Sequence, residues 1–375
     1  MKLLLSIYLI VLFTINSYAG DVIFNLPKLH IDNERIGITG ISSGAYMAIQ
    51  AQLSVPYAFK KAGILAGGPY ACAEGLNLEI EDGYQLFKCM NDMLDTEPYF
   101  ISAKRHMTPT NISHWALRAT ARGKYEYNTP GYSDLDNLQG GVVYFLHGVD
   151  DKVVIPEVAN AAVEVYKQIR SINFMNGKLI EDKPVKIEII NDGNRDFQHT
   201  FPTRASRTSA CDKSESPFIA ACGIDAAGLI FENLYKKSIF PVNKDDIDYT
   251  TEFYQASIDA NLAQGSLAER GYAYIPKLCA SGTKCGVLIA LHGCNQNAER
   301  PDIGTQFVNK TGFNRWADAY NVIMLYPQIH TTEKNPSSCW DWMGYTGKNF
   351  AQSDATQIEF FISMLKAIGY VPPKL

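Results

Sequence analysis

The segment 35–48 places a tight glycine–serine turn between a strand pattern and a helix pattern. Residues 35–39 are rich in β-branched side chains, and the sequence Gly-Ile-Ser-Ser-Gly follows at 40–44. A serine hydroxyl becomes a useful nucleophile when it is held exposed beside a base, and a strand–turn–helix elbow exposes it in this way. Gly40 and Gly44 relieve the crowding on either side. The pattern therefore predicts Ser42 as a nucleophile, with a turn that carries no chemistry as the alternative.

The first 19 residues have the form of a secretory signal peptide. Met1 and Lys2 precede an apolar run, Leu3–Phe13, and a small-x-small cleavage pattern ends at Ala19. The run is shorter than the roughly 20 apolar residues that cross a bilayer. We therefore expect a secreted or periplasmic protein without stable membrane insertion, and an uncleaved anchor is the alternative.

Charge and composition indicate one globular catalytic domain. The chain has 39 acidic and 34 basic residues and no basic run, so nucleic acid is not an expected partner. Its length is sufficient to bury a large core. Because no low-complexity tract or linker interrupts it, we expect a single domain over residues 20–375, with insertions, that acts as a monomer.

Eight cysteines lie beyond the signal-like segment. An even number in an exported chain predicts disulfides. They form no paired Cys-x-x-Cys clusters, so we expect neither a metal site nor a cofactor. Pairing by proximity in the sequence is one of about a hundred possible connectivities, and it gives Cys72–Cys89, Cys211–Cys222, Cys279–Cys285 and Cys294–Cys339.

Several apolar runs have the character of strands that are buried on both faces of a parallel sheet. These runs are 141–148, 185–190, 286–293 and 322–326. Amphipathic helix patterns occupy 156–169 and 354–368. The alternation predicts an α/β fold, with a mostly parallel central sheet and helices on both faces.

Two of these runs end in His-Gly, and the residues that follow tell them apart. Asp150 and Asp151 follow the first turn, where a catalytic acid would stand just past a buried strand. Val153 and Val154 favour Asp151, although Asp150 stays open. Cysteine and amide residues follow Gly293, and such a turn can present backbone N–H groups to an oxyanion.

Of seven histidines, His199 best fits a catalytic base, because it follows the run at 185–190 by a short loop. A histidine that makes a structural hydrogen bond is the alternative. His147 and His292, inside the His-Gly turns, are expected to hydrogen-bond their loops. The order Ser42, Asp151, His199 is the order in which α/β-hydrolases carry their triad.

The oxyanion turn does not fit that order, since it normally precedes the elbow and here follows the histidine. Circular permutation explains the difference. It predicts that residues near Asp32 and Lys366 are neighbours, and that the strand at 35–39 is central in the sheet.

Four segments resemble the circularly permuted type of poly(3-hydroxybutyrate) depolymerase. They are 40–45, 291–296, 326–328 and 339–345. The resemblance implies a circularly permuted α/β-hydrolase fold with Ser42 as nucleophile, Asp151 as acid and His199 as base. It also implies an oxyanion hole from the amides of Ser43 and Cys294. Trp340, Trp342 and Tyr345 would line a polyester groove, with core packing as the alternative for these aromatic residues.

The sequence departs from many relatives in two ways. We expect no separate polymer-adsorbing domain, and Met343 stands where relatives often carry Trp or Gly. A Cys294–Cys339 disulfide would pin the oxyanion turn to the aromatic segment.

The expected function is hydrolysis of poly(3-hydroxybutyrate) or its oligomers by a serine esterase, through an acyl-enzyme. One alternative is a carboxylesterase of the feruloyl or acetyl-xylan type. An alternative of another class is a non-catalytic polymer- or granule-binding protein.

Overall fold

A computed structural model of the chain describes residues 22–23, 25–74, 84–92, 103–125, 134–171, 174–175, 178–179, 185–204, 209–236 and 250–373. The expected signal peptide at 1–19 lies outside these residues. Among them, no helix combines the length and the apolar content needed to cross a bilayer.

A nine-stranded sheet forms the centre of the molecule, in the order β1-β10-β11-β13-β12-β2-β3-β4-β7. Pairing is antiparallel only where β11 meets β10 and β13. The strands of this sheet are β1 (Val22–Ile23), β2 (Ile31–Ile41), β3 (Lys61–Leu65), β4 (Val142–Gly148), β7 (Glu188–Arg195), β10 (Thr251–Tyr254), β11 (Arg270–Tyr274), β12 (Cys285–Leu291) and β13 (Val322–Tyr326). Two small sheets hold β5 (Phe174–Met175), β6 (Lys178–Leu179), β8 (Phe201–Thr203) and β9 (Ile219–Ala221).

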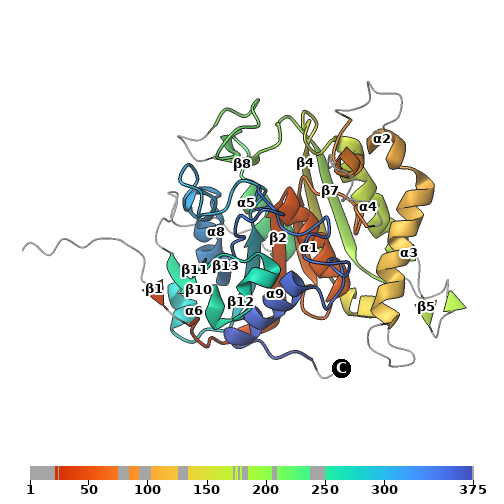
Figure 1. Cartoon of the computed structure of the whole chain (residues 1–375). Coiled ribbons are helices and arrows are strands. Elements are labelled where there is room, and N and C mark those ends of the chain that lie inside the picture. The colour runs from red at the N-terminus through yellow and green to blue at the C-terminus, as the bar shows by residue number, and fades with distance from the viewer. Residues whose placement is uncertain are drawn as a thin grey trace, which may run out of the picture.

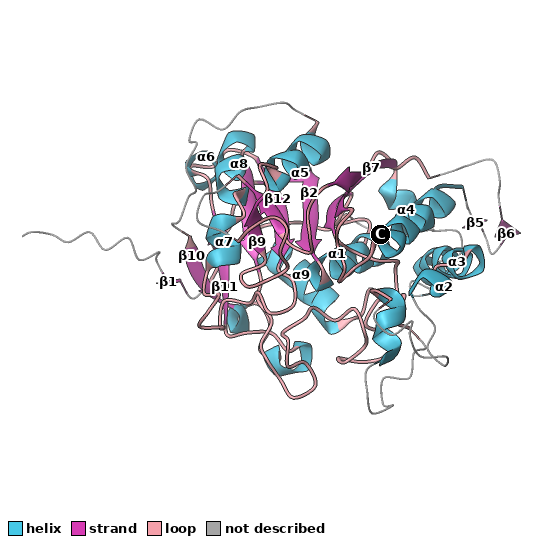
Figure 2. Ribbon diagram, turned by 90° about the horizontal axis from the view of Figure 1, so that it is seen from above, coloured by secondary structure: helices cyan, strands magenta, loops and turns pink. Residues whose placement is uncertain are grey.

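Helices cover both faces of the sheet. In Figure 2, α5 and α8 lie on one face and α1, α4 and α9 on the other. The α-helices are α1 (Ser43–Ser54), α2 (Ala103–His106), α3 (Pro109–Tyr125), α4 (Pro156–Ser171), α5 (Ala226–Tyr235), α6 (Lys277–Ala280), α7 (Gln306–Lys310), α8 (Phe313–Tyr320) and α9 (Thr356–Ala367). The 3₁₀ helices are η1 (Tyr84–Cys89), η2 (Asp134–Leu138), η3 (Gln255–Ser257) and η4 (Leu262–Gly265). The predicted α/β architecture is therefore confirmed, because apolar strands β4, β12 and β13 are buried throughout between these layers.

The run at 185–190 differs from its prediction. We expected a strand buried on both faces, but β7 begins at Glu188, continues to Arg195 and has half-exposed side chains. The cause is its position, since β7 is the last strand of the sheet and pairs only with β4. That pairing continues to Gly148 opposite Arg195, so part of the expected loop is strand.

The segment that leads into β2 lies beside the end of α9, at the lower side of the sheet in Figure 1. The Leu29 amide donates to the Ile368 carbonyl at 2.8 Å, and Lys28 Nζ donates to the Lys366 carbonyl at 2.8 Å. The strand β2 is interior, between β12 and β3. Both geometric expectations from the permutation argument, adjacent ends and a central strand, are met.

All four cysteine pairings expected from proximity in the sequence are present, and no cysteine among the described residues is free. They are Cys72–Cys89, Cys211–Cys222, Cys279–Cys285 and Cys294–Cys339. The last bond closes a separation of 45 residues and joins the turn after β12 to the aromatic segment.

Candidate active site

The turn between β2 and α1 has the form of a nucleophile elbow. Ser42 adopts φ 56° and ψ −125°, a left-handed backbone conformation that non-glycine residues rarely adopt, and its side chain is partly exposed. Its amide donates to the carbonyl of Leu65 at the end of β3, and its carbonyl accepts from Tyr46 in α1. A strained backbone held by its surroundings is typical of functional sites. The predicted strand–turn–helix form is confirmed.

Gly40 and Gly44 let the elbow and the neighbouring strand approach closely. A Cβ atom on Gly40 would lie 2.4 Å from the Gly44 carbonyl carbon. A Cβ atom on Gly44 would lie 2.4 Å from the carbonyl oxygen of Leu291 and 2.5 Å from that of His292. All three of these atoms belong to the backbone, which cannot rotate away as a side chain can. The two glycines therefore fix the distance between the elbow and the end of β12.

Replacing Gly44 with alanine should separate α1 from the end of β12. We expect a loss of about 1–3 kcal/mol in the free energy of unfolding, as for other overpacked sites, and a loss of any activity that needs this distance. Denaturant unfolding and an ester assay measure both. Gly193→Ala is the control, because its new Cβ would meet only the end of the Asn191 side chain. Equal effects of the two substitutions would contradict the packing account.

Asp151 and His199 form a buried hydrogen-bonded pair. His199 Nδ1 lies 2.8 Å from Asp151 Oδ2, and the two residues are 6% and 2% exposed. The other carboxylate oxygen accepts the amides of Val153 and Val154, both at 2.9 Å. Asp150 is exposed. The geometry thus favours Asp151 over Asp150, the choice that the sequence left open.

The surroundings of Asp151 favour its charged form. Burial raises the pKa of this carboxyl, but the charge and hydrogen bond of His199, the nearby His147 and the Val154 amide outweigh burial, so the net shift of the pKa is downward. A carboxylate that stays ionised can orient one tautomer of His199 and stabilise its protonated form. With Nδ1 committed to Asp151, Nε2 is the ring nitrogen left for a substrate-side role.

These groups gather at one edge of the sheet. The carboxyl ends of β2, β3 and β4 are adjacent, because Ser42 donates to Leu65 and Ala66 donates to Leu146. Ser42 follows β2 and Asp151 follows β4. Tyr46, one turn into the helix after Ser42, lies close enough to the Asp151 charge for that charge to raise its pKa, second to the effect of burial.

The turn after β12 lies against the elbow. A Cβ on Gly293 would be 3.3 Å from Ser42 Cβ. The Gly293 amide donates to Gln296 Oε1 at 2.7 Å, and Gln296 Nε2 donates to the Pro217 carbonyl at 2.9 Å, so the side-chain amide braces the turn. Among the described residues, neither the Ser43 amide nor the Cys294 amide donates to a protein acceptor. Both amides are available for an oxyanion.

The two His-Gly histidines, alike in sequence, have opposite environments. His292 hydrogen-bonds its loop as expected: Nδ1 lies 2.7 Å from the Gly293 carbonyl, and Nε2 accepts the Ile329 amide at 3.3 Å. His147 does not, because neither of its buried ring nitrogens has a hydrogen-bond partner. The Val154 backbone favours the protonated form of this ring, but it is the weakest of the effects on the pKa of His147. The expectation for His147 was wrong.

Burial lowers the pKa of both rings, His147 and His292, to about 4. In the unfolded chain they take up protons below pH 6.5, whereas the folded protein keeps them neutral to about pH 4. The unfolded state then binds more protons, so the free energy of unfolding should decrease as the pH is lowered from about 6.5 to about 4, by up to about 1.4 kcal/mol per pH unit for each ring. Denaturant unfolding at several pH values measures the slope. His147→Phe with His292→Asn should flatten it, and an unchanged slope would contradict this assignment.

Among the described residues, one group has the composition of a metal site. It consists of His106 with Cys72 and Cys89. The two sulfur atoms are bonded to each other, and so neither is a thiolate ligand. This group does not fit a metal.

Comparison with known proteins identifies the family. Residues 271–369 match the family model "Esterase PHB depolymerase". A poly(3-hydroxybutyrate) depolymerase from Delftia acidovorans is 29% identical over 93% of this chain, which spans 63% of that protein's length. A polyhydroxybutyrate depolymerase from Talaromyces funiculosus is 30% identical, with 92% of each chain covered. This chain belongs to the polyhydroxybutyrate depolymerase family.

Solved structures of PHB depolymerases share its fold. The crystal structure of the Penicillium funiculosum enzyme has a TM-score of 0.71 at 27% identity, and covers 92% of this chain and 98% of its own. A serine-to-alanine variant of a PHB depolymerase, complexed with an R3HB trimer, has a TM-score of 0.70 with the same identity and coverage. The α/β-hydrolase fold expected from the sequence is thus shown.

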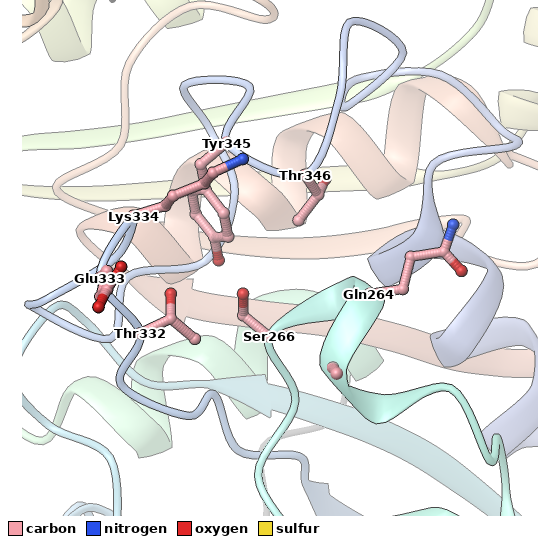
Figure 3. Close-up of a pocket in the computed structure, with 8 residues that line it drawn as sticks. Gln264, Ser266, Thr332, Glu333, Lys334, Tyr345 and Thr346 are labelled. Carbon is pink, nitrogen blue, oxygen red and sulfur yellow. The ribbon is translucent and has the colours of Figure 1, made fainter.

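Three aromatic residues were expected to line a groove, and they occupy different environments in the structure. Trp340 is fully buried, with its ring centroid 5.2 Å from Phe361, so its ring belongs to the core and not to a groove wall. Trp342 is 4% exposed, and its ring packs on that of Tyr46 with the two ring centroids 4.7 Å apart. Tyr345 is partly exposed and lines a cavity of about 420 Å³, shown in Figure 3.

Sequence reasoning missed Asp341 of this PHB depolymerase-family chain. Its carboxylate is 1% exposed and is saturated with hydrogen bonds from the loop that follows it. The sequence did contain one signal, because Asp341 places a charge between the largely apolar side chains of Trp340 and Trp342. A carboxylate buried in such a setting needs partners.

Proposed function

We propose that this chain is an exported serine esterase that hydrolyses poly(3-hydroxybutyrate) or its oligomers. Ser42 would be the nucleophile, His199 the base and Asp151 the acid. The observation that carries the proposal is the buried 2.8 Å contact between Asp151 and His199, at the same sheet edge as the strained elbow of Ser42. A non-catalytic binding protein has no use for such an arrangement.

In the acylation step, the Ser42 hydroxyl would attack an ester carbonyl while His199 takes its proton. Asp151 stabilises the imidazolium that forms, and the amides of Ser43 and Cys294 bind the oxyanion of the tetrahedral intermediate. His199 then gives the proton to the departing alkoxide. The ester bond of the substrate breaks, a hydroxyl-ended chain leaves, and an ester to Ser42 remains.

In the deacylation step, water replaces the alcohol. His199 takes a proton from the attacking water, the same two amides bind the second oxyanion, and the proton returns to Ser42 as the acyl bond breaks. The product is a hydroxyacid or its oligomer. The four groups that act on the substrate come from this chain alone, and none of these steps requires a cofactor.

The relatives support the substrate class. Those from Delftia and Talaromyces are named as depolymerases of this polyester, and one solved neighbour holds an R3HB trimer. The proposal that this polyester is also the substrate here rests on that similarity together with the site. Ester hydrolysis alone would also suit a feruloyl or acetyl-xylan esterase.

We take the domain to be circularly permuted, and the sheet order supports this. After the two-residue edge strand β1, the chain enters the centre of the sheet at β2, runs through β3 and β4 to β7 at one edge, and then crosses to β10 near the other edge. It returns through β11 to β12 beside β2, and β13 then fills the place between β11 and β12. The last helix, α9, ends beside the residues that lead into β2. Export is supported by the signal-like sequence at 1–19 and by four disulfides.

A substrate comparison tests the proposed function. The purified mature chain should hydrolyse 3-hydroxybutyrate oligomers and leave feruloyl and acetyl-xylan esters essentially untouched. A preference for the feruloyl ester would overturn the substrate class but keep the esterase. No hydrolysis of any ester, together with binding to the polymer, would overturn the enzyme itself.

A further inference from the structure

Cys339 is disulfide-bonded to Cys294 of the oxyanion turn, and both its backbone amide and its backbone carbonyl make hydrogen bonds. Its amide donates to Asn335 Oδ1 at 2.9 Å, and its carbonyl accepts Asn335 Nδ2 at 2.8 Å. The same carbonyl accepts the hydroxyl of Tyr345 at 2.6 Å. Because the disulfide separates the two Cα atoms by only 4.2 Å, a shift of Cys339 is transmitted to Cys294.

Tyr345 is itself held in place. Gln357 Nε2 donates to its hydroxyl oxygen at 2.9 Å, while Gln357 Oε1 accepts the Asp341 amide at 2.9 Å. Since the phenol oxygen receives this hydrogen bond, its single proton is directed to the Cys339 carbonyl. Burial, followed by the charge of Asp341, raises the pKa of Tyr345 far above its ordinary value, so the donor proton is always present.

The buried carboxylate of Asp341 organises the backbone on which Tyr345 stands. Its Oδ1 accepts the amides of Met343, Gly344 and Tyr345, and its Oδ2 accepts the amide and the hydroxyl of Thr346. Loop residues fixed in this way are preorganised and do not need to order during a reaction.

The segment also touches the other half of the oxyanion hole. The Trp340 amide donates to Ser43 Oγ at 3.3 Å, and Gln50 of α1 donates to the Asp341 carbonyl at 3.0 Å. One network therefore contacts both residues whose amides would bind the oxyanion, Ser43 directly and Cys294 through the disulfide.

We propose that Tyr345 is a positioning residue of the oxyanion hole, acting through the Cys339 carbonyl and the disulfide on the Cys294 amide. This rests on the proposed esterase function. Figure 3 shows its ring at the cavity between the loops of Ser266 and Lys334, which is where a substrate-binding aromatic would stand. The two roles predict different kinetics, because a positioning residue acts on every ester whereas a binding surface acts on long ones.

The variant Tyr345→Phe separates the two roles, since it removes the hydroxyl and keeps the ring. We expect kcat to fall about 10- to 100-fold, the range for a misplaced catalytic group, with KM changed less than about twofold. The factor should be the same for a short chromogenic ester and for a 3-hydroxybutyrate trimer. The affinity for a boronic acid that mimics the tetrahedral intermediate should fall in parallel.

Two further variants make the test specific. Tyr370→Phe is the matched control: this buried tyrosine donates to the Tyr57 carbonyl at 3.4 Å, and its loss should leave kcat unchanged. Gln357→Glu replaces the amide donor with an acceptor that can draw the Tyr345 proton away from Cys339, and it should reproduce the fall in kcat.

Three outcomes are decisive. An unchanged kcat in Tyr345→Phe, or a loss confined to KM that grows with substrate length, would overturn the positioning role. A fall in kcat that both Tyr345→Phe and Gln357→Glu share, and that the control lacks, supports it. A wild-type enzyme inert toward both esters would reject the proposed function instead.

Discussion

Ser42→Ala is expected to reduce ester hydrolysis by roughly 10⁶-fold, the order seen when a serine nucleophile is removed from such a triad. The substitution removes the attacking oxygen and leaves the oxyanion amides in place. Stability should change little, because the φ of 56° is imposed by the elbow on either residue. The rate of hydrolysis of a soluble ester, followed together with the thermal midpoint, measures both effects.

A matched serine separates chemistry from packing. Ser54 ends the same helix, and its hydroxyl donates to the Gln50 carbonyl at 2.6 Å. Ser54→Ala should keep the rate near that of the wild type. If Ser42→Ala retained a tenth of the wild-type rate, another residue would have to be the nucleophile.

Asp151→Asn should lower kcat by about 10⁴-fold, because an amide in place of the carboxylate disturbs the His199 tautomer and removes the stabilising charge. The Val153 and Val154 amides now donate to Asp151 Oδ1, and His199 occupies Oδ2. The single side-chain oxygen of asparagine can accept either from the two valine amides or from His199, but not from both. Its NH₂ group then faces the remaining donor, and this also lowers the stability of the fold.

Asp150→Asn is the control for this prediction, since the neighbouring carboxylate is exposed and makes no such contact. Steady-state kinetics of both variants on one soluble ester give the comparison. A larger loss in Asp150→Asn than in Asp151→Asn would contradict the assignment of the acid.

Much of the catalytic edge could be predicted from local sequence. The elbow depends on two glycines and on a change from strand to helix within 14 residues. The apolar runs at β4, β12 and β13 correspond to strands that are buried on both faces. The disulfides followed proximity in the sequence because three of the four close short loops.

The rest depends on tertiary surroundings that local sequence does not encode. His147 and His292 both precede glycine after an apolar run, yet only His292 meets an acceptor and a donor. A tryptophan suits a core as well as a groove. Only the burial of Trp340 against Phe361 shows that its ring belongs to the core. The edge position of β7 follows from the sheet order, which no single strand reveals.

Product release from amorphous poly(3-hydroxybutyrate) tests the central claim most directly. The mature enzyme should release soluble 3-hydroxybutyrate or its oligomers, and the release should stop when an organophosphonate modifies Ser42. His199→Ala should abolish that labelling. An enzyme that is labelled at Ser42 and hydrolyses small esters, yet releases nothing from the amorphous polymer, would contradict the claim.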